Sequence, residues 1–273
     1  MNVTSVCGVS FSPTDNTRKV TNRIAQTLAG LLHVPCREIA WTLPQERAAV
    51  QHFAPAELVV VGAPTYAGKL PNKILPDYQN NLKADGALAV GVVTFGNRSF
   101  DNSLAELCCT LEANGFHTVA GGAFVGTHAF SDALATGRPN DADWREIDAF
   151  AEKIAAKVQS LTQIPAPIAV SGDASAPYYV PKETDGQPAK FLKAKPQTHR
   201  DRCTGCGLCA RLCPMGSIEL GDPTQVTGIC IKCQRCVRSC PAQAKYFDDP
   251  AFLSHVQMLE QNFSRGAENY MAV

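Results

Sequence analysis

The residues with the clearest chemistry are cysteines near the C-terminus. Two copies of a Cys-x-x-Cys-x-x-Cys-x-x-x-Cys-Pro run lie 27 residues apart. Three thiols within seven residues can wrap one face of an iron–sulfur cube, because two intervening residues allow a tight turn back to the metal. We therefore expect both runs to bind [4Fe–4S] clusters. The first run holds Cys203, Cys206, Cys209 and Cys213, and the second holds Cys230, Cys233, Cys236 and Cys240.

Zinc and disulfides are the other common uses of cysteine. Zinc sites usually need two Cys-x-x-Cys pairs far apart in sequence, which these runs do not provide. Disulfides need an oxidising compartment, and we find no signal that directs the chain to one. The remaining cysteines, Cys7, Cys36, Cys108 and Cys109, lie in strand-like or helix-like segments, where we expect them to be small buried hydrophobic side chains.

The composition predicts a soluble chain of about two domains. Hydrophobic residues make up 45% of the 273 positions, which is enough for a proper core. The formal net charge is zero, so neither nucleic acid nor an acidic membrane surface is an expected partner. No run approaches the ~18 apolar residues of a membrane span. The start lacks the basic and apolar regions of a signal peptide, and we expect a cytoplasmic location.

The first 162 residues alternate strand-like and helix-like segments. This alternation predicts an α/β domain with a doubly wound parallel sheet of five strands and helices on both faces. We expect strands over residues 3–11, 37–41, 57–63, 87–95 and 117–125, and helices over residues 17–32, 102–114 and 142–161.

Residues 163–198 are rich in proline and have no periodicity, which is typical of a linker. A loose tether would serve electron transfer poorly, so we expect 178–180 (Tyr-Tyr-Val) to pack onto a domain surface. The cysteine-rich domain covers residues 199–249, and the segments 217–220 and 244–247 after the two runs are expected to pair as small strands. Residues 250–273 predict a short helix over 250–262 and a frayed tail.

Three loops of the first domain leave the carboxyl ends of predicted strands, where doubly wound sheets bind ligands. The loop 12–17 places hydroxyl and amide groups where a helix begins, which suits a phosphate held by neutral donors, although such residues are also common helix caps. Loops 64–71 and 96–101 each carry an aromatic residue, a glycine and polar backbone, which suits a flat heterocycle. Tyr66 and Phe100 are either stacking partners or buried loop anchors. The candidate ligand residues are Ser12, Thr14, Asn16, Thr17, Pro64, Thr65, Tyr66, Ala67, Gly68, Gly96, Asn97, Arg98, Phe100 and Asp101.

With these loops in this order, residues 1–162 resemble flavodoxins. Residues 12–17 resemble the FMN phosphate loop, 64–71 the second flavin loop and 94–101 the third. The whole chain resembles the flavodoxin–ferredoxin fusion proteins of anaerobic bacteria. The resemblance implies a flavodoxin-like sheet of strand order 2-1-3-4-5, bound FMN, and a small α+β bacterial-ferredoxin-like domain with two [4Fe–4S] clusters.

In bacterial two-cluster ferredoxins each run gives three cysteines to one cluster and its fourth to the other. The resemblance therefore implies crosswise ligand sets. Cys203, Cys206, Cys209 and Cys240 would hold one cluster, and Cys230, Cys233, Cys236 and Cys213 the other.

The chain departs from flavodoxins at Asp15, where they usually have glycine. An acid near a phosphate is repulsive, but aspartate tolerates a left-handed backbone conformation. His128 follows the fifth predicted strand in a segment that also resembles the family, and is either a flavin-edge residue or a surface histidine.

These features predict an iron–sulfur flavoprotein that couples one-electron and two-electron redox partners. The alternative is a flavin-dependent reductase of a quinone or nitro compound fed through the clusters, and a third is a redox sensor or a subunit of a larger complex. No G-x-G-x-x-G follows a predicted strand, which speaks against a Rossmann-type nicotinamide site.

The expected partners are redox proteins, an acidic ferredoxin or a reductase. Between His199 and Asp249 there are seven Arg or Lys and five Asp or Glu, a balance of 7 − 5 = +2. Arg235 and Arg238 flank cluster cysteines and would attract an acidic donor. Alternatively, these arginines offset the clusters or contact the first domain.

Overall fold

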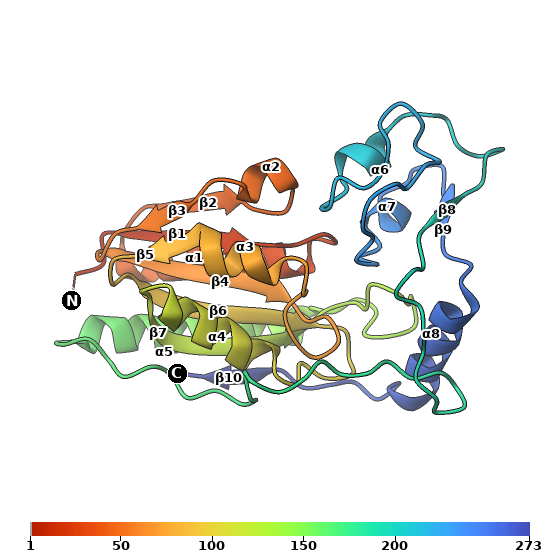
Figure 1. Cartoon of the computed structure of the whole chain (residues 1–273). Coiled ribbons are helices and arrows are strands. Elements are labelled where there is room, and N and C mark those ends of the chain that lie inside the picture. Colours follow the sequence, from red (N-terminus) through yellow and green to blue (C-terminus); the bar gives the residue numbers. More distant parts are fainter. Residues whose placement is uncertain (1) are drawn as a thin grey trace.

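The computed structural model describes residues 2–273. Within this part of the chain, six strands form the central sheet in the order β10-β7-β6-β4-β1-β2 (Figure 1). Five of them are parallel, and numbered among themselves they follow the order 2-1-3-4-5 of a flavodoxin-like sheet. Their bounds are β1 Ser5–Ser10, β2 Cys36–Ala40, β4 Glu57–Pro64, β6 Leu88–Phe95 and β7 His117–Val125.

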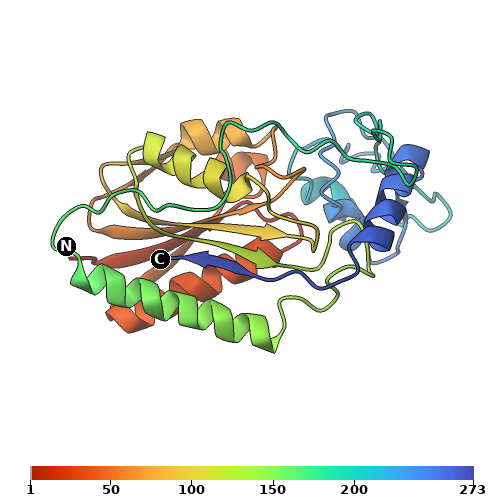
Figure 2. The ribbon, with the colours of Figure 1, turned by 90° about the horizontal axis from the view of Figure 1, so that it is seen from below.

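Helices cover both faces of the sheet (Figure 2). Helices α1 (Asn16–Leu32) and α5 (Asp141–Ser160) pack on one face, and α3 (Leu75–Asn81) and α4 (Ser103–Ala113) pack on the other. All eight residues of β6 are buried, as expected of a central parallel strand with both faces covered. The predicted doubly wound fold is confirmed.

The C-terminal tail is not frayed, and that expectation was wrong. Strand β10 (Tyr270–Ala272) pairs antiparallel with β7 and adds a sixth strand to the sheet (Figure 2). Without it β7 would be an edge with unpaired backbone groups. The Asn269 side chain fixes the approach: its Oδ1 accepts a hydrogen bond from the Val125 N–H at 2.9 Å, and its Nδ2 donates to Asp143 at 2.8 Å.

The proline-rich segment 163–198 runs along the surface of the first domain. Tyr178 donates its hydroxyl to the Leu70 carbonyl at 2.9 Å, and the Tyr179 N–H donates to the Ala67 carbonyl at 2.8 Å. Both tyrosines therefore pack as expected. Val180 does not, because 58% of its surface is exposed.

The cysteine-rich domain lies beyond the carboxyl ends of the parallel strands (Figure 1). We had expected the segments after the two cysteine runs to pair with each other, and this expectation was wrong. Lys245–Tyr246 (β9) pairs with Gln197–Thr198 (β8), and Ile218 forms a bridge with Val226. The end of the linker therefore supplies the second strand. The other short elements are α2 (Pro44–Arg47), β3 (Gln51–Phe53), β5 (Leu82–Ala84), α6 (Leu208–Arg211), α7 (Arg235–Arg238) and α8 (Pro250–Asn262).

The two cysteine runs have the same backbone conformation but different residues at the left-handed positions. Gly207 (φ 69°) before α6 corresponds to Gln234 (φ 62°) before α7, 27 residues later. Gly216 (φ 59°) likewise corresponds to Gln243 (φ 48°). Glycine adopts this conformation without strain, whereas other residues do so at a cost of roughly 1–2 kcal/mol.

This difference predicts that Gln243→Gly stabilises the protein by about 1 kcal/mol, because Gln243 is exposed and its strain is relieved. Thermal unfolding should show a midpoint higher by about 2–4 °C. Gln243→Ala retains the β-carbon and is expected to give no gain. A gain of the same size in both variants would mean that the glutamine side chain, and not the backbone conformation, is unfavourable.

The expectation that the four remaining cysteines are buried holds for two of them and is wrong for the other two. Cys7 and Cys108 are buried in the core, but Cys36 and Cys109 are exposed. Cys36 lies on the outer strand β2, which has few neighbours to cover it. Within residues 2–273, no helix has both the length and the apolar character needed to cross a bilayer.

Candidate functional site

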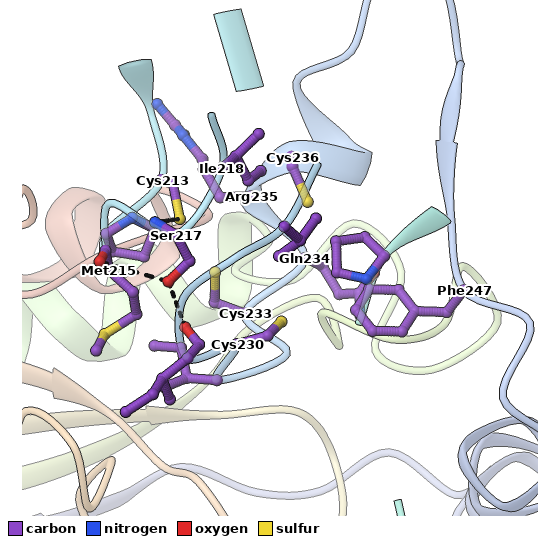
Figure 3. Close-up of a pocket in the computed structure, with 15 residues that line it drawn as sticks. Cys213, Met215, Ser217, Ile218, Cys230, Cys233, Gln234, Arg235, Cys236 and Phe247 are labelled. Carbon is purple, nitrogen blue, oxygen red and sulfur yellow. Dashed lines mark hydrogen bonds between the residues drawn. The ribbon is translucent and has the colours of Figure 1, made fainter. Parts of the chain in front are cut away.

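The cavity nearer to the first domain, called here the near cavity, is lined by four cysteines from both runs: Cys213, Cys230, Cys233 and Cys236. Their side chains lie around one space, which measures about 370 Å³ when the part open to solvent is included (Figure 3). Apolar residues such as Met215, Ile218 and Phe247 complete its wall. Four thiols around one largely apolar space suit a [4Fe–4S] cube.

A second cavity, the far cavity, is lined by the other four cysteines: Cys203, Cys206, Cys209 and Cys240. The space between them measures about 350 Å³ when the part open to solvent is included. In each cavity three cysteines come from one run and the fourth comes from the other. The structure therefore groups the eight cysteines in the two crosswise sets that the ferredoxin resemblance implies.

Backbone N–H groups point at several of these sulfurs. The Ser217 N–H donates to Cys213 Sγ at 3.4 Å, and at the equivalent position of the second run the Ala244 N–H donates to Cys240 Sγ at 3.3 Å. The Lys232 N–H donates to Cys230 Sγ at 3.4 Å. Such bonds stabilise negative charge on the sulfurs and raise the potential of a cluster.

The two cavities differ in exposure. Burial raises the pKa of the Cys236 thiol to about 12, and burial also raises the pKa of Cys233. In contrast, the pKa of Cys206 is lowered, first by a hydrogen bond from the Leu208 N–H and then by the Thr204 side chain. Cys206 is exposed to solvent, whereas none of the four cysteines of the near cavity is, so the far cavity has the more accessible ligand.

The near cavity lies against the predicted flavin loops. Burial raises the pKa of Tyr66 well above its ordinary value, and the neighbouring Cys233 and Cys230 raise it further. The carbonyl of Pro214, next to Cys213, accepts a hydrogen bond from Arg47 Nη2 of α2 at 2.7 Å. Met215 and Ile231 of the near cavity pack against the core of the first domain. The second flavin loop and the near cavity are therefore neighbours.

The predicted phosphate loop lies at the start of α1. Within residues 2–273, the Arg18 and Lys19 N–H groups donate to Ser12 Oγ and the Asp15 carbonyl, whereas those of Asn16 and Thr17 have no protein acceptor. Two free N–H groups at the N-terminus of a 17-residue helix suit a phosphate.

The side chains of this loop divide into two groups. Thr17 is buried and its hydroxyl is paired with Thr94 Oγ1 at 2.7 Å, and Asn16 Nδ2 donates to the Thr127 carbonyl at 3.0 Å. These two residues would therefore serve a phosphate through their N–H groups. Thr14 is partly exposed. That all four candidate residues contact a phosphate stays a prediction.

The second loop is a tight turn from Tyr66 to Lys69. Ala67 (φ 48°) and Gly68 (φ 77°) at its centre both have positive φ, as in a type I′ turn. Thr65 Oγ1 shares a hydrogen bond with Ser103 at 2.7 Å, and Pro64 ends β4. Lys69 is buried and is paired with Glu106 at 3.0 Å.

The third loop is held by segments that lie far away in sequence. Asn97 Nδ2 donates to the carbonyls of Phe263 and Arg265, and Asn97 Oδ1 accepts from the Ala267 N–H at 3.0 Å. The Phe100 ring lies 5.6 Å from Phe95, in the manner of a loop anchor rather than a free stacking face.

The charged residues of this loop are also paired. Arg98 forms an ion pair with Asp101, and its guanidinium lies 3.9 Å from the centre of the Tyr179 ring. Next to them, Gly96 leaves room for the ring of His128.

His128 is only partly exposed. Burial lowers its pKa to about 4, and its Nδ1 accepts a hydrogen bond from the Phe130 N–H at 3.1 Å. Its ring is packed between the third loop and Phe130, at a centroid distance of 5.2 Å from the latter.

Arg235 and Arg238 face the first domain rather than solvent. Arg235 Nη1 lies 2.8 Å from Asp15 Oδ2 in the phosphate loop. Arg238 donates to the carbonyls of His128 and Ala129 and is paired with Asp132. Of the two alternatives for these arginines, the contacts match the one in which they pair with the first domain.

Comparisons with known proteins agree with the cysteine motifs. A family model described as a 4Fe–4S binding domain matches residues 196–219, and a second model with the same description matches residues 227–243. The search of curated proteins gave no match. The C-terminal domain is therefore a ferredoxin-type 4Fe–4S binding domain.

Several solved structures are similar to the first domain. A flavodoxin from the domain Archaea is 15% identical and covers 57% of this chain and 99% of its own, with a TM-score of 0.38. Flavodoxin 2 from Bacillus cereus is 17% identical, with 57% and 99% coverage and a TM-score of 0.38. An NADH:FMN oxidoreductase in its apo form is 16% identical, with 59% and 94% coverage and a TM-score of 0.42. At these scores the fold assignment rests on the strand order itself.

Proposed function

We propose that this chain is an electron carrier that binds FMN in its first domain and two [4Fe–4S] clusters in its C-terminal domain. The observation that carries the proposal is the link between the two predicted sites: Arg235, which lines the near cavity, lies 2.8 Å from Asp15 of the phosphate loop. Cys230 and Cys233 of that cavity are also close enough to Tyr66 of the second loop to raise its pKa. Bound FMN would exchange one or two electrons and each cluster one, which couples two-electron and one-electron partners.

The chain's own residues hold the two sites together. Arg47, Arg235 and Arg238 each make a hydrogen bond or ion pair across the domain boundary. The linker and the C-terminal tail contact the second and third loops from outside, through Tyr179 and Phe263. Loops covered in this way favour the carrier over the alternative reductase, which needs an open pocket above the flavin for its organic substrate.

The surface around the far cavity is the proposed entry face for an external redox protein. Thr204, Gly205 and Cys206 are exposed there, and Leu220, with 61% of its surface exposed, lies against Gly207. Three arginines, Arg200, Arg202 and Arg211, are exposed in this part of the domain, together with the acids Asp201 and Glu219 and the partly exposed Asp222. An apolar residue beside an exposed ligand, with arginines nearby that an acidic partner could pair with, fits an acidic ferredoxin.

Charge reversal tests this face. Arg200→Glu/Arg202→Glu should slow reduction of the protein by an acidic two-cluster ferredoxin about tenfold at low salt, because electrostatic steering is lost. The rate in the unaltered protein should fall as salt is added. Stopped-flow absorbance at a range of ferredoxin concentrations measures both effects.

The matched control is Arg145→Glu/Lys153→Glu, which makes the same change of charge on the exposed surface of α5. We expect less than a twofold effect from it. Equal slowing in both variants would assign the effect to net charge, and no slowing in either would place the entry of electrons elsewhere.

A further inference from the structure

The phosphate loop has a charge that a phosphate site should not have. Asp15 adopts φ 66° and ψ −7°, a left-handed conformation that glycine adopts most easily and that aspartate tolerates. Its side chain adds a carboxylate beside the N–H groups at the start of α1. A phosphate bound there would be repelled by this carboxylate.

No cation inside the loop 12–17 offsets Asp15. Arg18 follows the loop, but its guanidinium is used by Glu38, with Nε 2.5 Å and Nη2 3.3 Å from the two carboxylate oxygens. The cation that forms an ion pair with Asp15 is Arg235, at 2.8 Å, from the other domain. The pair is partly shielded from water, since 23% of the Arg235 side chain and 41% of the Asp15 side chain are exposed.

The same arginine also belongs to the near cavity. Arg235 lines that cavity and is the neighbour in sequence of Cys236, which lines it as well. One residue therefore connects the phosphate loop to a cluster ligand. The contact spans 220 positions of the sequence, so it forms only when the C-terminal domain is docked.

We propose that Arg235 completes the FMN phosphate site from the second domain by neutralising Asp15, so that FMN binding and docking of the cluster domain strengthen each other. This inference rests on the proposed function. If docking raises the affinity for FMN by some factor, bound FMN must favour docking by the same factor, because the coupling of two equilibria is reciprocal.

Equilibrium dialysis of the full-length protein, with clusters in place and flavin removed, tests the first half. Arg235→Leu should raise the Kd for FMN about tenfold, the effect of one uncompensated charge near the phosphate. The Kd for riboflavin, which has no phosphate, should change less than twofold. In an Asp15→Gly background the Arg235→Leu change should lose most of its effect on FMN.

Arg238→Leu is the matched control, because it removes a positive charge and an interdomain contact from the same short helix without touching Asp15. We expect it to leave the FMN/riboflavin ratio of Kd values unchanged. The proposal would be overturned if Arg235→Leu weakened FMN and riboflavin binding equally, or if it weakened FMN binding as much in the Asp15→Gly background as in the unaltered protein. An unchanged Kd for FMN in Arg235→Leu would also overturn it.

Two further measurements cover the remaining cases. If Arg235→Leu lowers the iron content, the Asp15→Asn variant is tested in its place. Asp15→Asn should bind FMN at least threefold more tightly than the unaltered protein, and weaker binding would contradict the proposal. Trypsin cleavage at the exposed linker residues Lys190 and Lys193 reports docking, and FMN should slow it in the unaltered protein but not in Arg235→Leu. FMN that gives no protection in the unaltered protein would overturn the reciprocal coupling. Failure of the unaltered protein to bind FMN would instead contradict the proposed function.

Discussion

Cys240→Ser is expected to remove the cluster of the far cavity and to leave that of the near cavity in place, although Cys240 belongs to the second run. The far cavity is lined by Cys240 together with the three closely spaced cysteines of the first run. Loss of one of four thiolate ligands should lower the iron content from about eight toward about four per chain. Iron analysis and EPR of the reduced protein measure the result.

The assignment of the lost cluster needs matched variants. The EPR spectrum of Cys240→Ser should match that of Cys206→Ser, and the spectrum of Cys213→Ser should match that of Cys233→Ser. If Cys240→Ser instead matched Cys233→Ser, each run would hold its own cluster and the crosswise sets would be wrong.

Arg47→Met should destabilise the protein more than any other single change between the domains. The Arg47 guanidinium is buried and donates to Asp77 at 2.5 Å, to the Thr42 carbonyl at 2.7 Å and to the Pro214 carbonyl at 2.7 Å. Removal of one partner of such a pair costs about 3–5 kcal/mol. The midpoint of thermal unfolding should fall by roughly 6 °C or more.

Asp77→Asn is the control for this change, because it removes the ion pair but keeps both carbonyl partners of Arg47. Because 30% of the Asp77 side chain is exposed, Asp77→Asn should lower the free energy of unfolding by only about 1 kcal/mol. Equal destabilisation by the two variants would mean that the contact with Pro214 contributes nothing to the joining of the domains.

Much of the first domain could be predicted because its elements are long and their patterns are regular. Helix α1 buries Val20, Ile24 and Leu28 at helical spacing, and β4 is a continuous apolar run. Near the C-terminus, α8 begins and ends at the predicted residues, with Asp249 accepting a hydrogen bond from the Phe252 N–H as its cap.

The missed features depend on contacts between distant parts of the chain. Strand β10 has three residues and no pattern of its own, and it exists because β7 offers it an edge. The pairing of β9 with β8 likewise depends on where the linker ends. Charge counts left open whether Arg235 meets an external partner or the first domain, since the sequence gives no sign that Asp15 lies beside it.

The most direct test of the proposed function is the cofactor content of the intact chain purified without oxygen. Iron, acid-labile sulfide and released flavin are measured on one sample, with the flavin identified by chromatography. The arrangement of two four-cysteine cavities and one phosphate loop predicts about eight iron, about eight sulfide and about one FMN per chain. About four iron, FAD in place of FMN, or no flavin after reconstitution would contradict it.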